Sequence, residues 1–233
     1  MRIGLIYTAV MLEDGRIGLS FTFHRGRRGN CSRLWAVCPM PGRDASELVE
    51  MLHAPEEVER AVALATVNAL ANSKAGGARE GDFLGMLDIK PGEQVGMVGL
   101  FAPVLPRLRE RTSSILIFEQ NPGRQADLLP EEDAYRLLPG CGVALITSTS
   151  IVNQTIDRLL AAARSCREVV LLGASTPLVP QAFAGTCVTL LSGVIVHEPG
   201  EILRRVSEAG GTRSFKGHVR KVNVAVRNEA HRA

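Results

Sequence analysis

The chain has 233 residues, 45% of them hydrophobic, which is enough apolar material for one large or two small buried cores. Its 27 basic and 24 acidic residues leave a net charge of only +3, so composition does not indicate a nucleic-acid partner. No stretch approaches about 20 uninterrupted apolar residues, which disfavours a membrane span. The five cysteines are scattered without a CxxC pair, and this pattern predicts reduced thiols and a cytoplasmic protein.

The N-terminal part of the chain begins with a predicted hairpin. Two β-prone runs, 3–12 and 17–24, are joined by Asp14 and Gly15, a pair that favours the positive φ of tight turns. A third strand is expected over residues 34–37, before two prolines that cannot donate to a ladder.

Two helices are predicted after this hairpin. Asp44 or Ser46 can cap the first, and the second starts near residues 55–57 and carries an apolar pattern to Leu70. The glycine-rich stretch 74–78 is the candidate boundary. We therefore expect a small α+β domain at residues 1–78 and a second domain at residues 79–233.

In the second domain, strands alternate with helices, which is the pattern of a parallel sheet with crossover helices. The strands are nearly continuous apolar runs, as expected for strands covered on both faces, and fall at 94–100, 114–118, 142–146, 168–172, 187–191 and 193–197. Helices are expected at 103–111, 130–138, 150–165, 177–184 and 199–208. The predicted fold class is therefore α/β, with a Rossmann-like parallel-sheet domain after the small α+β domain.

Polar residues follow most of these strands. Ligands of open parallel sheets bind outside the carboxyl ends of the strands, so these residues are candidates for a binding site. The candidates are Glu119, Thr147, Ser148, Thr149, Asn153, Gly173, Ser175, Thr176, Ser192 and Gly193.

The segment GASTPL at 173–178 reads as a helix start. Gly173 permits a close backbone approach or a positive φ, Ser175 or Thr176 can cap, and Pro177 suits the first helical turn. N–H groups at such a start suit an anionic ligand. The alternative is a capped helix start without a ligand. The hydroxyl-rich run 147–150 repeats the pattern one strand earlier, which favours a site.

Glu119 follows a strand that reads as buried, which predicts a carboxylate at the same edge. There it can bind a metal ion, accept a proton or contact a ribose hydroxyl. The alternative is an exposed carboxylate at a strand end. Asn153 falls in the first turns of the helix expected at 150–165, where its side chain faces either the site or solvent.

Several familiar motifs are missing. Gly96 and Gly99 do not complete GxGxxG, since no third glycine opens the following helix. The histidines and cysteines lack the spacing of a preformed zinc site, and no GxSxG elbow is present. A metal ion bound by Glu119 together with hydroxyl or carbonyl oxygens therefore stays a candidate cofactor. It would be a divalent or transition metal ion.

The second domain resembles a known family through a set of segments. These are VGMVGLFAPVLPRLRER (95–111), IFEQNPG (117–123), LPGCGVALITSTSIVNQTIDRLL (138–160), VVLLGASTPLVPQAF (169–183) and TLLSGVIVHEPGEILRRVSEAGGTRSFK (189–216). They resemble the prokaryotic family described as "putative heavy-metal chelation". The resemblance implies a domain similar to the N-terminal domain of enolase, a Rossmann-like domain, and a site at their junction.

The same resemblance brings in Lys216, which matches an FK element of the family and can bring a cation to an anionic ligand. The alternative is a solvated lysine. Two departures stand out: Ala174 replaces a proline that is usual in the family, and an aspartate common near His197 is missing. The first implies a less rigid loop, and the second implies a less negative local charge.

Three functions compete at this point. The first is a module that binds a small molecule, a metal or a metal chelate, with a role in heavy-metal chelation. The second is an enzyme that acts on a small anionic or heterocyclic metabolite, with Glu119 as base and the 173–178 segment as an anion cradle. The third is a scaffold or assembly partner, which is favoured because the sequence shows no complete catalytic set of residues. A homo-oligomer is among the expected partners.

Overall fold

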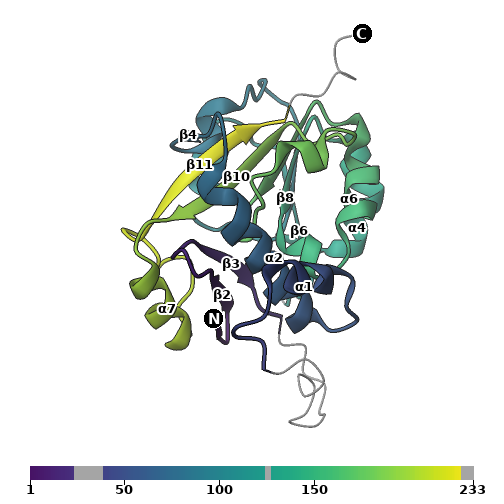
Figure 1. Ribbon diagram of the computed structural model, residues 1–233. Coiled ribbons are helices and arrows are strands. Elements are labelled where there is room, and N and C mark those ends of the chain that lie inside the picture. Colours follow the sequence, from purple (N-terminus) through teal and green to yellow (C-terminus); the bar gives the residue numbers. More distant parts are fainter. Residues whose placement is uncertain (24–38, 124–126, 227–233) are drawn as a thin grey trace. The chain divides into compact units, whose positions relative to one another are not determined.

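The computed structural model describes residues 1–23, 39–123 and 127–226 (Figure 1). The chain divides into two compact units: unit 1 comprises residues 1–75, 174–178 and 193–220, and unit 2 comprises 76–173, 179–192 and 221–233. The two units are not contiguous in sequence, unlike the domains expected at 1–78 and 79–233, which stay a prediction. In the described part of the chain, no helix is both long and apolar enough to cross a membrane.

Unit 1 contains a three-stranded antiparallel sheet. Its strands are β1 (Arg2–Ile3), β2 (Tyr7–Met11) and β3 (Ile17–Phe21), in that order. The predicted hairpin is confirmed: β2 pairs with β3, and Gly15 in the connection has a φ of +85°. The first predicted strand is divided in two, because the chain turns back between β1 and β2. The third strand expected at 34–37 lies outside the described residues.

Two helices follow the hairpin in unit 1. They are α1 (Ala45–Glu50) and α2 (Glu57–Ala71), and each is extended by a short 3-10 helix, Met51–His53 and Asn72–Lys74. The predicted cap is confirmed, since the Asp44 carboxylate accepts the N–H of Ser46 at 2.8 Å.

The sheet of unit 1 is covered on both faces (Figure 1). On one face, Val10 packs with Leu48 of α1 and Val62 of α2. On the other face, Tyr7 and Leu19 of the sheet pack in one cluster with Ile202 and Val206 of α7 (Pro199–Ser207) and with Phe215. The second cover comes from the far end of the sequence, which is why unit 1 takes in residues 193–220.

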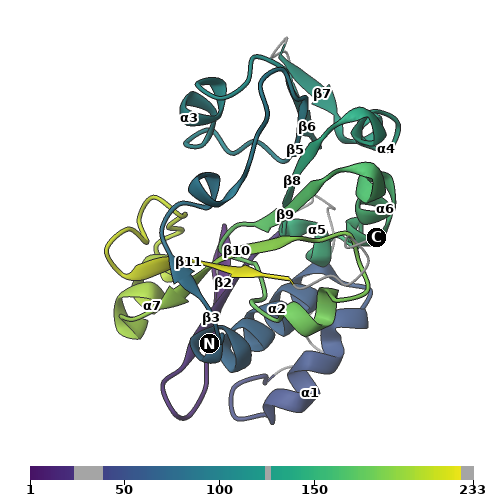
Figure 2. The ribbon, with the colours of Figure 1, turned by 90° about the horizontal axis from the view of Figure 1, so that it is seen from above.

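Unit 2 contains most of a larger sheet, in which the parallel strands lie side by side in both ribbon views (Figures 1 and 2). The strands in spatial order are β4 (Arg79–Glu80), β11 (Val219–Ala225), β10 (Leu190–Val196), β9 (Glu168–Leu172), β8 (Val143–Thr147), β5 (Val95–Val98), β6 (Ile115–Glu119) and β7 (Leu128–Pro130). From β10 to β7 every pairing is parallel, while β4 pairs antiparallel with β11. The predicted α/β class with a mainly parallel sheet is confirmed.

One strand prediction was wrong. Strands were expected at 187–191 and 193–197, but a single strand, β10, runs through Leu190–Val196 with Gly193 inside it. A Cβ on Gly193 would lie 3.1 Å from the carbonyl oxygen of Thr176 and 3.0 Å from a methyl carbon of Leu178. This glycine therefore permits a close backbone approach within the strand rather than ending it.

The helices of unit 2 are shorter than the sequence predicts. They are α3 (Leu105–Arg109), α4 (Glu131–Leu137), α5 (Thr149–Val152) and α6 (Ile156–Ala162). The single helix expected over 150–165 is two helices, because Gln154 adopts a left-handed φ of 62° between them.

The prediction of an α-helix over 177–184 was also wrong. Only a 3-10 helix, Pro180–Phe183, forms there. Val179, which precedes a second proline, has an extended φ of −120°, as residues before proline often do. Within the described residues, no α-helix begins in the 173–178 segment, so the sequence argument for an anion cradle at that helix start loses its basis.

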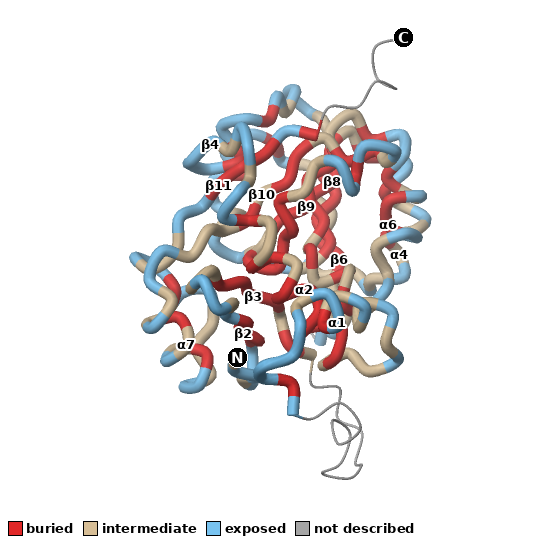
Figure 3. Tube along the Cα trace, in the orientation of Figure 1, coloured by how far each residue is buried: buried red, intermediate tan, exposed pale blue. Residues whose placement is uncertain are grey.

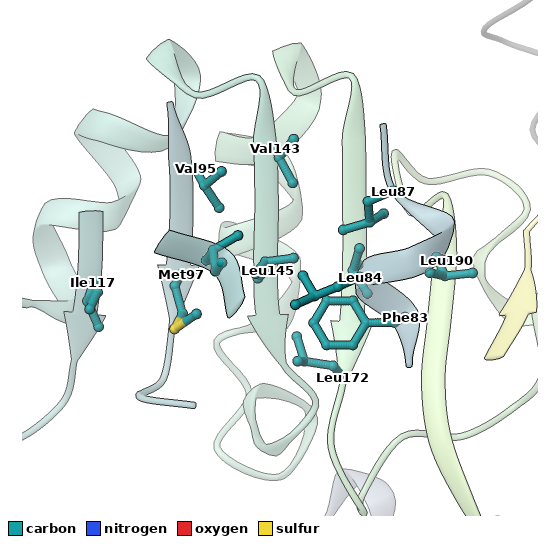
Figure 4. Close-up of a cluster of buried hydrophobic side chains, with 12 residues drawn as sticks. Phe83, Leu84, Leu87, Val95, Met97, Ile117, Val143, Leu145, Leu172 and Leu190 are labelled. Carbon is teal, nitrogen blue, oxygen red and sulfur yellow. The ribbon is translucent and has the colours of Figure 1, made fainter. Parts of the chain in front are cut away.

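One part of the core of unit 2 is a cluster against one face of its parallel sheet. The 3-10 helix Phe83–Met86 brings Phe83 and Leu84, with Leu87 just beyond it, onto Leu145 and Leu172 of the strands (Figure 4). The strands β8 and β9 are buried along almost their whole length (Figure 3). This burial on both faces makes the strands rigid supports for the loops at their carboxyl ends.

Candidate functional site

The strand order of unit 2 reverses at its centre. The chain moves outward from β5 through β6 to β7 on one side, and from β8 through β9 to β10 on the other. Such a reversal splays apart the loops that leave two adjacent strands, and open α/β sheets bind ligands in the crevice that this creates. The reversal lies between β5 and β8, so the loops after these two strands define the candidate site.

Register places three residues in one row at this edge. Val98 of β5 pairs with Phe118 of β6 and with Ile146 of β8. One residue further along each strand, Gly99 lies between Glu119 and Thr147. Because neighbouring strands are about 4.8 Å apart, the backbones of Glu119 and Thr147 are separated by about 10 Å, with glycine between them.

The Glu119 carboxylate is fixed by backbone donors. Its Oε2 accepts the N–H of Leu100 at 2.9 Å, and its Oε1 accepts the N–H of Gln120 at 3.0 Å. The side chain thus ties the loop after β6 to the loop after β5. Glu119 is only partly buried, so the carboxylate is held in place while still open to solvent.

Gly99, at the same edge of the sheet, has a backbone conformation and surroundings that favour glycine. Its φ is +85°, a conformation that favours glycine, and a Cβ there would lie 3.0 Å from the Thr147 side chain. The glycine therefore lets the chain turn out of β5 directly beside Thr147. Sequence reasoning considered Gly99 only as part of a missing GxGxxG motif and assigned no site role to Leu100. The signal that marks both is a glycine at the end of the first parallel strand.

The hydroxyls after β8 form a local network. Thr147 Oγ1 and Thr149 Oγ1 lie 3.0 Å apart, and the Ser150 hydroxyl donates to the carbonyl oxygen of Thr147 at 2.6 Å. Thr147 and Thr149 are partly exposed, while Ser148 is fully buried. The two threonines present hydroxyls at the edge of the sheet, whereas Ser148 is not accessible there.

Asn153 is placed by the break between α5 and α6. Its Oδ1 accepts the N–H and the hydroxyl of Thr155, at 3.1 and 2.8 Å. This local turn leads the chain into α6, which is a structural task of the kind asparagine often performs. Its role in ligand binding stays a prediction.

Gly173 and Ser192 lie further along the same edge. Thr147 pairs with Leu172, and Leu172 pairs with Ser192, so Ser192 is four strands from Glu119. That distance is about 19 Å, which exceeds the span of most small metabolites. A ligand held by Glu119 therefore reaches Thr147 but not Ser192.

Ser175 and Thr176 belong to unit 1, where they are 1% and 0% exposed. Ser175 Oγ accepts the N–H of Phe21 at 2.8 Å, and the Asn72 amide donates to the carbonyl oxygen of Thr176 at 3.0 Å. These bonds anchor the 174–178 loop to β3 and to the end of α2. Ligand binding by Ser175 and Thr176 stays a prediction.

Gly193 and Lys216 are also in unit 1. Gly193 is buried within β10, and Lys216 is exposed, with its backbone in a bridge to Val219. Neither residue belongs to the Glu119 row, which lies wholly in unit 2.

Metal-ligating side chains do not gather at any one place in residues 1–23, 39–123 and 127–226: no three His, Cys, Asp or Glu there can hold one ion. The Glu119 edge offers one carboxylate with threonine hydroxyls, which are hard oxygen donors. This set suits a metal that already carries donor atoms of its own better than it suits a bare ion.

The three described cysteines of unit 2 are buried and are poor thiolate sources. Burial raises the pKa of Cys141 to about 11 and that of Cys166 to about 12, and burial likewise raises the pKa of Cys187. All three therefore stay protonated at neutral pH, and a thiol is a weaker metal ligand and nucleophile than a thiolate.

These thiols are expected to resist alkylation in the folded protein. At pH 8 the raised pKa of Cys141 lowers its thiolate fraction on the order of 100-fold against an ordinary thiol, so iodoacetamide should react at least that much more slowly. Peptide mass spectrometry after timed labelling, with and without urea, measures each cysteine separately. Equal labelling of Cys166 in folded and unfolded protein would show that the burial is wrong.

A hollow of about 920 Å³ also lies in unit 2, away from the Glu119 row. Its lining includes Arg79, Glu168, Gln181, Thr189 and Asn223. Glu168 and Thr189 lie at or before the amino ends of β9 and β10, so the hollow is at the opposite edge of the sheet from the predicted site. None of the residues predicted from the sequence lines it.

Comparisons with known proteins cover almost the whole chain. Two family models, each described as "putative heavy-metal chelation", match residues 1–71 and 82–225. An uncharacterized protein of Methanocaldococcus jannaschii is 26% identical over 95% of this chain and 87% of its own length.

Two solved structures are similar in fold. A protein of unknown function from Desulfitobacterium hafniense gives a TM-score of 0.82 at 24% identity, with 96% of this chain and 89% of that chain covered. A protein of unknown function from Pyrococcus horikoshii gives 0.81 at 21% identity, with 96% and 90% covered. At these identities the likeness establishes the fold alone. The labels Rossmann-like and enolase N-terminal-like stay predictions.

Proposed function

Because the chain belongs to the family described as "putative heavy-metal chelation", we propose that it binds a small metal-carrying ligand at the carboxyl edge of its parallel sheet. The Glu119 carboxylate is the main contact, and the hydroxyls of Thr147 and Thr149 lie across Gly99 from it. The metal arrives as cargo, already held by a chelator, because this edge supplies a single carboxylate.

One observation carries the proposal. Two backbone N–H groups orient the Glu119 carboxylate at the strand-order reversal, where open α/β sheets place their ligands. A carboxylate that is already fixed loses little side-chain entropy on binding, which favours its use as a ligand contact.

The test is thermal and chemical unfolding with defined probes. Fe³⁺, Ni²⁺, Co²⁺ and Zn²⁺ are each added as the free ion and as the citrate complex. A probe present at 100 times its dissociation constant stabilises the folded protein by about 2.7 kcal/mol. Glu119→Gln should weaken binding of that probe by roughly 10- to 100-fold, since it removes a charged hydrogen-bond acceptor.

Glu110→Gln is the matched control, because Glu110 is an exposed carboxylate of the same unit and the charge change is identical. It should bind the probe as the unaltered protein does. The proposal fails if no probe stabilises the protein, or if the stabilisation survives Glu119→Gln.

An enzyme that acts on a small anionic or heterocyclic metabolite is the second candidate. The observation that favours it is the spacing of the row: the backbones of Glu119 and Thr147, which carry a carboxylate and a hydroxyl, lie about 10 Å apart, and this leaves room for a ligand between a proton acceptor and a donor. Mass spectrometry of each stabilising probe after incubation with the protein tests this. Unchanged probe masses would contradict it.

A further inference from the structure

The Glu119 carboxylate can accept two more hydrogen bonds, one on each oxygen. A carboxylate can accept about four hydrogen bonds, roughly two on each oxygen. Backbone N–H groups of Leu100 and Gln120 occupy one position on each oxygen. In the part of the chain that the structure describes, one acceptor position therefore remains on each oxygen, and the carboxylate cannot swing to change their direction without losing the backbone bonds.

Two hydroxyl groups on adjacent carbons match this arrangement. Both oxygens of a vicinal diol can donate side by side to the two oxygens of one carboxylate, and charge-assisted bonds of this kind are stronger than neutral ones. A single hydroxyl or a single N–H uses only half of the remaining capacity. The geometry of Glu119 is therefore selective for a paired donor.

The position of Glu119 in the sheet indicates which kind of vicinal diol it binds. In nucleotide-binding α/β folds, a glycine ends the first parallel strand and an acidic residue about 20 positions later holds the ribose hydroxyls. Here Gly99 follows β5, and Glu119 ends the adjacent strand β6, 20 positions later in the numbering. A ribose is thus favoured over other vicinal diols.

The loop after Gly99 does not have the sequence of a phosphate-binding loop. After Gly99 come Leu100, Phe101, Ala102 and Pro103, without the further glycines that let a pyrophosphate approach the backbone. The helix that follows, α3, has only five residues. Leu100 is 37% exposed next to the carboxylate that its N–H binds, so it offers an apolar surface to a base rather than a donor to a phosphate.

We propose that the ligand of this site carries a ribonucleoside group without a phosphate, whose 2′- and 3′-hydroxyls both donate to the Glu119 carboxylate. This assignment rests on the proposed binding function of the same edge and names its ligand class. The base lies over Leu100, and the remainder of the ligand extends past Gly99 toward Thr147.

Isothermal titration of the full chain tests the assignment. The probes are adenosine, guanosine, cytidine and uridine, with 2′-deoxyadenosine, 3′-deoxyadenosine, ADP and catechol as discriminating arms. We expect at least one ribonucleoside to bind, each deoxy form to bind 10- to 100-fold more weakly than adenosine when adenosine is the binder, and ADP to bind no more tightly than adenosine. Glu119→Gln should reduce ribonucleoside binding by the same factor, and Glu110→Gln should leave it unchanged.

Three results would overturn the assignment: no ribonucleoside binds, the deoxy forms bind equally well, or catechol binds while the ribonucleosides do not. Tighter binding of ADP would overturn its phosphate-free part. The metal-citrate titrations separate this proposal from the broader one. If Glu119→Gln abolishes binding of a metal complex while no ribonucleoside binds, only the ribose assignment fails. If a ribonucleoside binds through Glu119 and no metal probe does, the metal-carrying role fails instead.

Discussion

Replacement of Asn72 by alanine is expected to lower the free energy of unfolding by about 3 kcal/mol. The Asn72 side chain is 4% exposed and makes three hydrogen bonds within unit 1. Its Nδ2 donates to the carbonyl oxygens of Thr176 and Val194 at 3.0 and 3.3 Å, and its Oδ1 accepts the N–H of Leu178 at 2.9 Å. Alanine leaves three backbone groups without this partner, and each buried unsatisfied group costs about 1–3 kcal/mol.

Urea unfolding followed by circular dichroism measures this loss. Because the chain has two compact units, a separate transition for each unit is watched for before a single free energy is assigned. Asn121→Ala is the control, since Asn121 is exposed and its replacement should change stability by no more than about 0.5 kcal/mol. Equal midpoints for the two variants would show that Asn72 does not hold the 174–178 loop.

A second large effect is expected from Gly18→Ala. Gly18 lies in β3 directly against α2, and a Cβ there would lie 2.1 Å from the carbonyl oxygen of Ala65 and 2.2 Å from the nitrogen of Ala69. Both atoms belong to the helix backbone, which cannot rotate away as a side chain can. Strand and helix must separate, and we expect a loss on the order of 4 kcal/mol or failure to accumulate folded protein.

Gly200→Ala is the matched control for this variant. Gly200 lies in α7 of the same unit, and a Cβ there meets nothing within 4 Å. Alanine is the better helix former by about 1 kcal/mol, so this variant should be as stable as the unaltered protein or slightly more so. Yield and urea midpoint are compared side by side. A Gly18→Ala protein as stable as Gly200→Ala would contradict the close packing of β3 on α2.

Local signals in the sequence predict much of this fold. The Asp14-Gly15 turn, the Asp44 cap and the apolar strands β5, β6, β8 and β9 all depend on residues close together in the chain, and the structure confirms them. Three strands of the larger sheet were missed: the two edge strands β4 and β7, and β11 inside the sheet. β4, β7 and β11 have two, three and seven residues, and none is a continuous apolar run of the kind that marks the buried strands.

The wrong predictions arise where distant residues decide the conformation. Residues 177–184 carry good local signals for a helix start, yet the N–H of Leu178 bonds to the side chain of Asn72, 106 positions earlier. Gly193 reads locally as a strand end, yet it is a close-approach glycine in β10 beside Thr176. Partners so remote in sequence leave no trace in a local pattern.

The candidate site likewise has a part that the sequence predicted and a part that it could not predict. Glu119 and Thr147 were predicted because parallel strands bring their carboxyl ends to one edge, and the register places them in one row around Gly99. The relation of Glu119 to the N–H of Leu100 could not be predicted, since it depends on which strand lies next to β6. Strand order is the one property that a list of strands does not contain.

A crystal structure with the probe that stabilises the protein most tests directly whether the ligand binds at the Glu119 edge of the sheet. We predict ligand density within hydrogen-bonding distance of both Glu119 carboxylate oxygens and beside Gly99. Density confined to the hollow lined by Glu168 and Asn223, with the Glu119 edge holding only solvent, would contradict binding at that edge.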